Sequence, residues 1–385
     1  MRINASLLPF LVATSVFGLA CTAAAIDPPK TAPPPPPPPP PPTVTVATAA
    51  PTEPPPAATP PPAATPAATA QPAPPLDSFA ASTNSASVAA CPPDMQLVDG
   101  EYCTEVEHKC KRSWFDKSNK KVVCEEFEPV ATCVGAKVKK RYCVDTYEWP
   151  NQKGVRPEVM NRFHQAEIKC ASVGKRMCTE SEWNFACEGP QMTPFPYGFV
   201  RDAAKCNGDH AWDGPDMKKV AKRDGGELAR LWHGVPSGSQ PQCISAFGVA
   251  DMPANTDEVV ASEQPKGSRH AKFDSVHTGG PWYKGVRNQC RPKVYTHDED
   301  FYYYFLSFRC CAEADGKPTD PRTPWQLRDK WPVDRVEKRA GFTIEEMRKK
   351  LELKKQGQCV CPEQDILCKT MCGTLLGPGA VDAKH

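Results

Sequence analysis

The chain has 385 residues, with 45 prolines, 19 cysteines and a formal net charge of +2. Acidic and basic residues are interspersed along it, which excludes the basic stripe of a protein that binds nucleic acid. Cysteine at this density is unusual in a reducing compartment, and it indicates an exported protein, periplasmic or at the cell surface.

The first 25 residues have the features of an export signal. Arg2 precedes an apolar run from Leu7 to Leu19, which is too short for a membrane-spanning helix but suits a signal peptide. Two processing sites compete. Ala23 to Ala25 would suit a signal peptidase, whereas the sequence ending at Cys21 is similar to a lipoprotein signal, in which lipid on that cysteine anchors the chain to a membrane. Cys21 is also the only cysteine before residue 91, and without it eighteen of the 19 remain, an even number.

Residues 26–90 form a linker dominated by proline, alanine and threonine, with ten consecutive prolines at 33–42. Such a composition cannot bury a core and favours the extended polyproline helix. We expect either a stiff spacer that holds a domain away from a membrane or a disordered tether with no ligand of its own.

Residues 91–139 are predicted to form a disulfide-rich subdomain with short strands such as Met95–Val98 and Lys121–Cys124. Its cysteines, together with Cys143, number six, which allows fifteen pairings that the sequence does not distinguish. A zinc site is the alternative, but no Cys-x-x-Cys motif occurs here. The six cysteines are Cys91, Cys103, Cys110, Cys124, Cys133 and Cys143.

Helical periodicity marks the next segment. Apolar residues recur on one stripe between Arg156 and Gly174, which predicts a helix there, with His164 off the stripe in a solvated or capping role. Thr179 and Glu182 have the spacing of a capping box and predict a second helix that reaches Cys187.

Six motifs follow one another in the next part of the chain. They are KRMCTESEWNFACEG at 175–189, FPYG at 195–198, AFGVADM at 246–252, NTDEV at 255–259, GGPW at 279–282 and SFRC at 307–310. In this order and at these distances they resemble the motifs of the formylglycine-generating enzyme (sulfatase-modifying factor) family over about residues 140–312, and the first is similar to the family's TE-x-EW motif.

This resemblance implies an α+β fold of the C-type-lectin-like kind over residues 140–315, rich in disulfides and long loops and poor in regular secondary structure. It also implies calcium, because the family binds the ion through an Asn, a backbone carbonyl and a Glu, which fall here at Asn255, Thr256 and Glu258. A second site would use Asn207 and the Gly208 carbonyl. Oxygen ligands of this kind are those that Ca²⁺ prefers.

The copper chemistry of the catalytic family members is not matched by the residues here. Two cysteines after the GGSW motif bind copper(I) in those enzymes, but the corresponding positions hold Lys284 and Gln289, with Cys290 one residue later, and Pro281 replaces the family's serine. A single thiol cannot form a two-coordinate bis-thiolate, so copper is not expected. Cys290 is then a disulfide partner or, in the alternative, a catalytic thiol.

The stretch from Gly279 to Cys311 is the most distinctive part of the chain. The paired glycines allow a close backbone approach, and Trp282, Arg287 and Arg291 are candidate binding residues. The aromatic run 301–305 is predicted to be a strand buried on at least one face.

Residues 316–385 follow as a tail, with a loop over 318–332 and a helix over 343–355. Four cysteines close the tail, for which two disulfides are expected and a zinc knuckle is the alternative.

Taken together, the sequence predicts a cell-envelope lipoprotein whose domain is a binding or structural module for a protein, peptide or glycan. A metal-dependent oxidoreductase of the formylglycine-generating or non-haem-iron type is the alternative.

Overall fold

The computed structural model describes residues 90–376, apart from residues 118, 119, 266, 269, 271 and 284. The predicted signal sequence, Cys21, nearly all of the linker and Lys284 lie outside the described residues. Across the part that the structure describes, no helix has both the length and the apolar composition needed to cross a bilayer.

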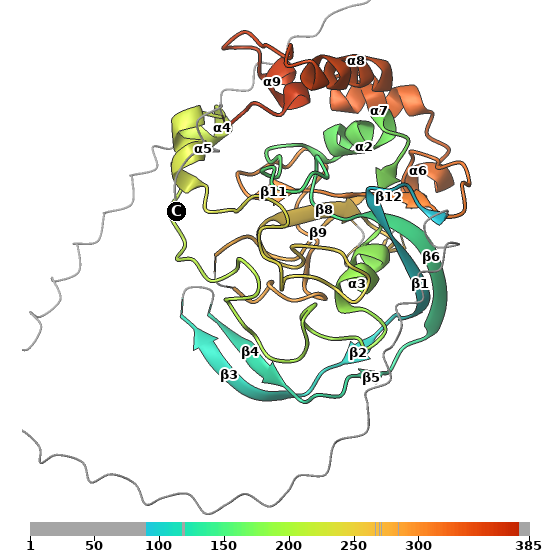
Figure 1. The fold of residues 1–385 in the computed structure, drawn as a ribbon, viewed down its shortest axis with the longest axis vertical. Coiled ribbons are helices and arrows are strands. Elements are labelled where there is room, and N and C mark those ends of the chain that lie inside the picture. Colours follow the sequence, from blue (N-terminus) through green and yellow to red (C-terminus); the bar gives the residue numbers. More distant parts are fainter. Residues whose placement is uncertain are drawn as a thin grey trace, which may run out of the picture. The chain divides into compact units, whose positions relative to one another are not determined.

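Two four-stranded sheets and two short ribbons make up the β structure of the described residues (Figure 1). The first sheet is antiparallel, in the order β1 (Met95–Cys103), β6 (Lys137–Asp145), β12 (Cys310–Glu313), β7 (Arg176–Met177). The second has the order β10 (Lys293–Val294), β9 (Ser275–Thr278), β8 (Asp257–Ala261), β11 (Leu306–Ser307), and its β8–β11 pair is parallel. The ribbons pair β2 (Val106–Glu107) with β5 (Thr132–Cys133) and β3 (Cys110–Asp116) with β4 (Lys121–Phe127).

The helices are short, and long loops join them. In the domain they are α2 (Phe163–Ser172), α3 (Glu180–Glu188), α4 (Met217–Ala221) and α5 (Gly225–Leu231). In the tail they are α6 (Pro324–Arg328), α7 (Val333–Ala340), α8 (Ile344–Lys355) and α9 (Ile366–Cys372). Figure 1 shows α7, α8 and α9 grouped beside α2, which α7 and α8 contact directly. The α+β class with long loops is therefore confirmed.

The segment predicted as a separate N-terminal subdomain shares a sheet with the rest of the domain. β1 pairs with β6 over nine residue pairs, and the predicted boundary at residue 140 falls within β6. The six cysteines expected to pair among themselves do so, as Cys91–Cys143, Cys103–Cys133 and Cys110–Cys124. The two predicted short strands lie within β1 and β4.

Disulfides also join the domain's helices to its sheets. Cys310 bonds Cys170 of α2, and its neighbour Cys311 bonds Cys178, just before α3. Adjacent residues of a strand point to opposite faces, so the doubled cysteine ties β12 to α2 on one face and to the segment between β7 and α3 on the other. The other bonds are Cys187–Cys290, Cys206–Cys243, Cys359–Cys372 and Cys361–Cys368, the last two being the pair expected in the tail.

Local sequence signals gave some helix ends correctly and others wrongly. The capping boxes at Thr179 and Thr343 are both present, and α3 and α8 begin directly after them. α2, however, begins at Phe163 rather than 156, because the backbone amides of Glu158 and Met160 bond to Trp149 and Tyr303, and Met160 has a φ of 67°. The predicted loop 318–332 contains α6, which starts at another capping box.

The prediction of a strand over 301–305 was wrong. Residues 301–303 are irregular and 304–305 form a turn, so only Leu306–Ser307 joins the sheet. The reason is visible in the ring packing, since Tyr303 and Tyr304 lie 4.6 Å apart and both contact Phe305, at 4.7 and 5.0 Å. Consecutive side chains that pack on one another cannot alternate between two faces.

Candidate functional site

Trp282 lies at the centre of the stretch that the sequence singles out, but it is a core residue. Its side chain is only 1% exposed and packs edge-on against Trp232 at 4.7 Å, with Tyr304 at 6.1 Å on another side. The backbone before it passes close to its neighbours, as the paired glycines predict, because a Cβ on Gly279 would lie 2.8 Å from the Pro253 carbonyl oxygen. Trp282 is therefore part of the buried core on which more exposed aromatic rings pack.

Partly exposed aromatic rings cover this core. Trp212, which is 59% exposed, is a hydrogen-bond partner of Tyr304, and Tyr283 packs edge-on against Phe305 at 5.6 Å. Trp232 and Tyr303 are half-buried on the same base. We call these four rings the aromatic platform: Trp212, Trp232, Tyr283 and Tyr303. Trp212 is exposed, the other three rings are half-buried, and apolar side chains exposed together are typical of a place where a partner binds.

Polar groups lie beside the platform. The side chain of His233, next to Trp232, contacts Asp213, next to Trp212, with 2.7 Å between Nε2 and Oδ2. The rings of His210 and His233 stack at 5.5 Å, and the His210 backbone amide donates to the Trp282 carbonyl. These groups can supply hydrogen bonds around a ligand that stacks on the rings.

Arg287, predicted as a binding residue, reaches the edge of the platform. Its guanidinium lies 2.7 Å from Asp257 Oδ2 and also bonds the Tyr283 hydroxyl group. Burial raises the pKa of Asp257 to about 6, against the lowering effect of Arg287. With 21% of its side chain exposed, Arg287 is held in place by Asp257 and presents a limited cationic edge.

Arg291, the other predicted binding arginine, points elsewhere. It forms a bidentate pair with Glu188 at the end of α3, at 2.5 and 2.6 Å, and donates to the Cys103 carbonyl at 2.7 Å. It also lies over the Tyr102 ring at 5.1 Å. Arg291 therefore joins the N-terminal strands to the domain, and the structure does not bring it to the platform.

Cys290 is fully buried and bonded to Cys187 of α3. A disulfide sulfur has no thiolate to bind copper or attack a substrate, so the geometry favours the disulfide interpretation over the catalytic one. The nine disulfides use every cysteine that the structure describes. Gln289 is described here, whereas Lys284 is not.

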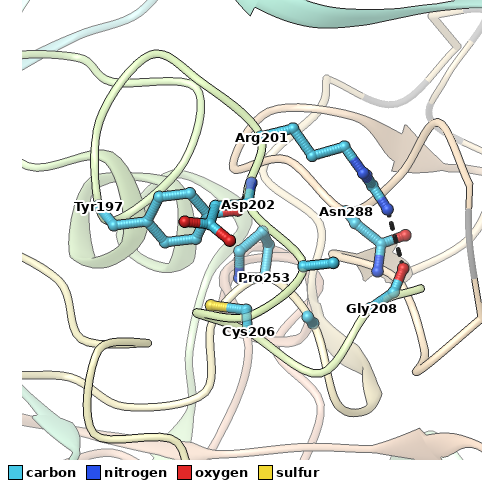
Figure 2. Close-up of a pocket in the computed structure, with 9 residues that line it drawn as sticks. Tyr197, Arg201, Asp202, Cys206, Gly208, Pro253 and Asn288 are labelled. Carbon is cyan, nitrogen blue, oxygen red and sulfur yellow. Dashed lines mark hydrogen bonds between the residues drawn. The ribbon is translucent and has the colours of Figure 1, made fainter. Parts of the chain in front are cut away.

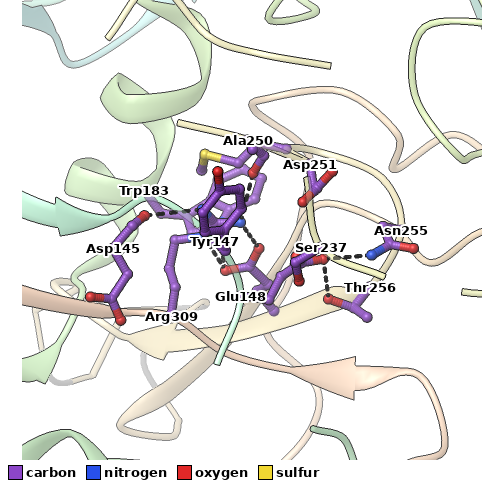
Figure 3. A network of polar contacts seen from close by, with 12 residues as sticks. Asp145, Tyr147, Glu148, Trp183, Ser237, Ala250, Asp251, Asn255, Thr256 and Arg309 are labelled. Carbon is purple, nitrogen blue, oxygen red and sulfur yellow. Dashed lines mark hydrogen bonds and ion pairs between the residues drawn. The ribbon is translucent and has the colours of Figure 1, made fainter. Parts of the chain in front are cut away.

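The predicted calcium ligand Asn255 lies in a buried polar network (Figure 3), and Glu258 joins this network through Arg309. Both carboxylate oxygens of Glu258 accept from Arg309, at 2.7 and 2.8 Å, and one also accepts from Trp183 Nε1. Asn255 donates to Glu148 at 2.9 Å, while its Oδ1 accepts from the Val235 amide. Burial holds the pKa of Glu148 well above its usual range, because charge is costly there.

The second predicted pair lies directly beside the first. Asn207 Nδ2 donates to Asn255 Oδ1 at 3.1 Å, its own Oδ1 contacts His210, and the Gly208 carbonyl accepts from Arg201 at 2.8 Å. Figure 2 shows this last bond at the wall of a small pocket of about 10 Å³, room for about one water.

Four residues predicted as calcium ligands therefore have side-chain or carbonyl oxygens that already contact protein groups, namely Asn207, Gly208, Asn255 and Glu258. A carboxylate already neutralised by a buried arginine gains little from a cation, and the nearby guanidinium would repel it. The residues as arranged do not fit calcium well, so its binding stays a prediction. The Thr256 side chain donates to Glu148 at 3.3 Å in the same network.

The family of the chain follows from a direct comparison. Residues 81–314, more than half of the chain, match the model of the sulfatase-modifying factor enzyme 1-like domain, and the chain belongs to that family. The match begins before the strand β1, so it includes the segment that the sequence suggested was a separate subdomain.

Three solved structures are similar to it at low identity. CarF is 12% identical, covering 59% of this chain and 98% of CarF, with a TM-score of 0.38. PvdO from Pseudomonas aeruginosa is 16% identical, covering 57% and 94%, at 0.33. Treponema denticola variable protein 1 is 13% identical, covering 57% and 94%, at 0.34. No curated protein matches the chain.

Proposed function

We propose that this chain is an exported, lipid-anchored envelope protein whose family domain acts as a binding or structural module, without copper-dependent oxidation. The observation that carries the proposal is the disulfide bond between Cys290 and Cys187. It leaves no free thiol at Cys290, which is one residue after the position of the family's second copper-binding cysteine. Disulfides throughout the described residues support export to an oxidising compartment. The signal sequence and Cys21 support the anchor.

The aromatic platform is the surface that we assign to the partner, which is a protein, a peptide or a glycan. Trp and Tyr rings provide a large contact area with little loss of conformational entropy, and they dominate many binding surfaces. The His233–Asp213 pair and Arg287 lie within reach to fix the orientation of a ligand. Nothing in this arrangement needs a metal.

The alternative of a metal-dependent oxidoreductase has little support from the donor groups. Among the described residues, the single cluster of three close metal-ligating atoms belongs to Cys361, Cys368 and Cys372, all of which are disulfide-bonded. The histidines beside the platform lie outside any such cluster.

The chemistry is tested by incubating the full-length protein with copper(I) and a peptide that contains Cys-x-Pro-x-Arg, followed by detection of an aldehyde. We expect no aldehyde, because the cysteines of the described residues are all in disulfides and leave no thiol pair for copper(I). Copper-dependent aldehyde formation would contradict the proposal and place the oxidoreductase first.

The binding role is tested separately with two probes, insoluble cell-wall glycan and an array of envelope-protein peptides. Trp212→Ala and Tyr303→Ala should weaken binding about tenfold each, the loss of one well-packed ring. Val122→Ala is the control, since Val122 on β4 is 67% exposed and far from the platform in the chain. Equal binding by all three variants would contradict a role for the platform.

A further inference from the structure

A large cleft lies between the domain and helix α8 of the tail. Its volume is about 740 Å³, within the range of sites that hold small ligands. One wall is the turn after β6 with the end of α2, and the other is one face of α8. The lining includes Pro92, Pro150 and Gln152 on the side of the domain and Arg348, Leu351 and Lys355 on α8.

This cleft is distinct from the aromatic platform, with which it shares no lining residue. α8 lies beyond residue 314, where the family match ends, so one wall is supplied by an extension of this chain. That wall is held firmly, because Met347 packs in a buried cluster with Ile168 of α2, and Lys354 lies 2.7 Å from the buried Glu158 carboxylate.

A regular stripe of α8 faces the cleft. Arg348, Leu351, Glu352 and Lys355 are spaced at i, i+3, i+4 and i+7, which places them on one side of a helix. The stripe therefore has an apolar centre with a cation at each end, and Glu352 offsets one of them, since it lies 3.6 Å from Lys355 Nζ.

The other cations of the cleft are neutralised by neighbouring carboxylates. Lys175 lies 2.6 Å from Asp145, which is fully buried, and also pairs with Asp94. Burial by itself lowers the pKa of Lys175, but the attraction of these two carboxylates outweighs it, so the pKa lies above its ordinary value. Neither Lys175 nor Lys354 is therefore available to an incoming anion.

Arg348 differs from these lysines because it has no carboxylate partner in the described part of the chain. Its Nε donates to the Ser172 carbonyl at 3.2 Å, which fixes the guanidinium at the cleft and leaves its terminal nitrogens for another acceptor. A guanidinium binds a carboxylate through two parallel hydrogen bonds, a geometry that an ammonium group cannot match.

We propose that this cleft binds the end of a short peptide, with the terminal carboxylate on Arg348 and the preceding side chains against Leu351, Pro92 and Pro150. One unneutralised guanidinium matches one carboxylate, whereas the acids Asp94 and Glu352 in the same walls disfavour ligands with several negative charges. The Gln152 amide lies in the opposite wall, where it can pair with the peptide backbone.

The test uses the full-length protein and two bead-bound libraries of random tetrapeptides, one with free terminal carboxylates and the other with amidated ends. We expect the fluorescently labelled protein to retain at least tenfold more beads of the free-carboxylate library. Arg348→Gln should reduce retention to the level of the amidated library. Lys349→Gln, on the same helix with 71% of its side chain exposed, is the matched control and should retain beads like the parent protein.

Three results of the retention assay would overturn the proposal. They are equal retention of the two libraries, retention unaffected by Arg348→Gln, and no retention of free-carboxylate beads at all. A thermal melt checks that Arg348→Gln is folded, and Leu351→Gln provides a second variant on the apolar part, which should also lose retention. Displacement of bound beads by a few millimolar inorganic phosphate would show a general oxyanion site and would equally contradict a peptide-end site. None of these outcomes depends on the copper or platform experiments.

Discussion

A buried carboxyl group in α2 provides a quantitative test of the structure. Glu167 is 1% exposed, and its Oε2 accepts from Gln326 of α6 at 3.1 Å and contacts His164 at 3.0 Å. Its Oε1 is buried with no hydrogen-bond partner among the described residues. His164 is itself buried, rather than solvated as its place off the apolar stripe suggested. Glutamine at 167 would keep both contacts of Oε2 and resemble the protonated acid.

Burial raises the pKa of Glu167 from 4.5 to about 8, with the charge of Glu299 acting in the same direction and the Gln326 hydrogen bond opposing it. The folded protein therefore binds a proton between these pH values that the unfolded chain has lost, so stability falls as pH rises from about 4.5 to about 8. At ~1.4 kcal/mol per pH unit, the interval from 4.5 to pH 7 corresponds to ~3 kcal/mol.

Glu167→Gln removes this proton linkage. We expect the variant to be more stable than the parent at pH 7 to 8 by on the order of 1–3 kcal/mol, with the gain disappearing toward pH 4.5. Guanidinium unfolding with disulfides intact, followed by tryptophan fluorescence at several pH values, measures the difference. Glu345→Gln on α8, where the side chain is 65% exposed, is the control and should change little.

Two results would refute this reasoning. One is a Glu167→Gln protein that is less stable than the parent at pH 8. The other is a stability difference that is the same at pH 5 and pH 8, since a pH-independent difference cannot come from a titrating group. Asp274, whose pKa burial also raises to about 8, leaves part of the parent's pH dependence in the variant.

Three further predictions concern the anchor, calcium and the buried ion pair. Cys21→Ala should move the protein from the membrane fraction to the soluble fraction, and unchanged fractionation with a mature N-terminus at Ile26 would argue against lipid. If calcium binds, millimolar Ca²⁺ should raise the melting temperature, less so in Glu258→Ala, whereas melting indifferent to chelator removes the site. Arg309→Met should lower the free energy of unfolding by about 3–5 kcal/mol in denaturant titrations, because it leaves Glu258 buried without its partner; a loss below ~1 kcal/mol would contradict the structure.

Much of the fold was predictable because its signals are local. The capping boxes at Thr179 and Thr343 need only residues three positions apart, and ordered motifs were enough to suggest the family. The six N-terminal cysteines pair among themselves, although the sequence could not choose among fifteen pairings. The start of a helix was not predicted where it depends on residues far away in the chain. The Tyr303 carbonyl, for example, accepts from the Met160 amide and keeps residues before 163 out of the helix.

The candidate site was harder to predict because its parts come from separate loops. Trp212 and Trp232 have no periodic pattern around them, and only the base formed by Trp282 and Tyr304 brings them together. In contrast, residues chosen for their chemistry proved to be paired inside the protein. Arg291 forms an ion pair with Glu188, which lies about a hundred residues away in the chain. No rule of residue spacing reveals such a partner.

The state of Cys290 is the most direct test of the proposal that the domain lacks copper chemistry. The full-length protein is alkylated without reductant, digested and mapped by mass spectrometry under non-reducing conditions. We expect a linked peptide pair that contains Cys187 and Cys290, with no alkylated Cys290. Recovery of Cys290 mainly in alkylated form would show a free thiol beside Arg287 and Arg291, and it would contradict the account.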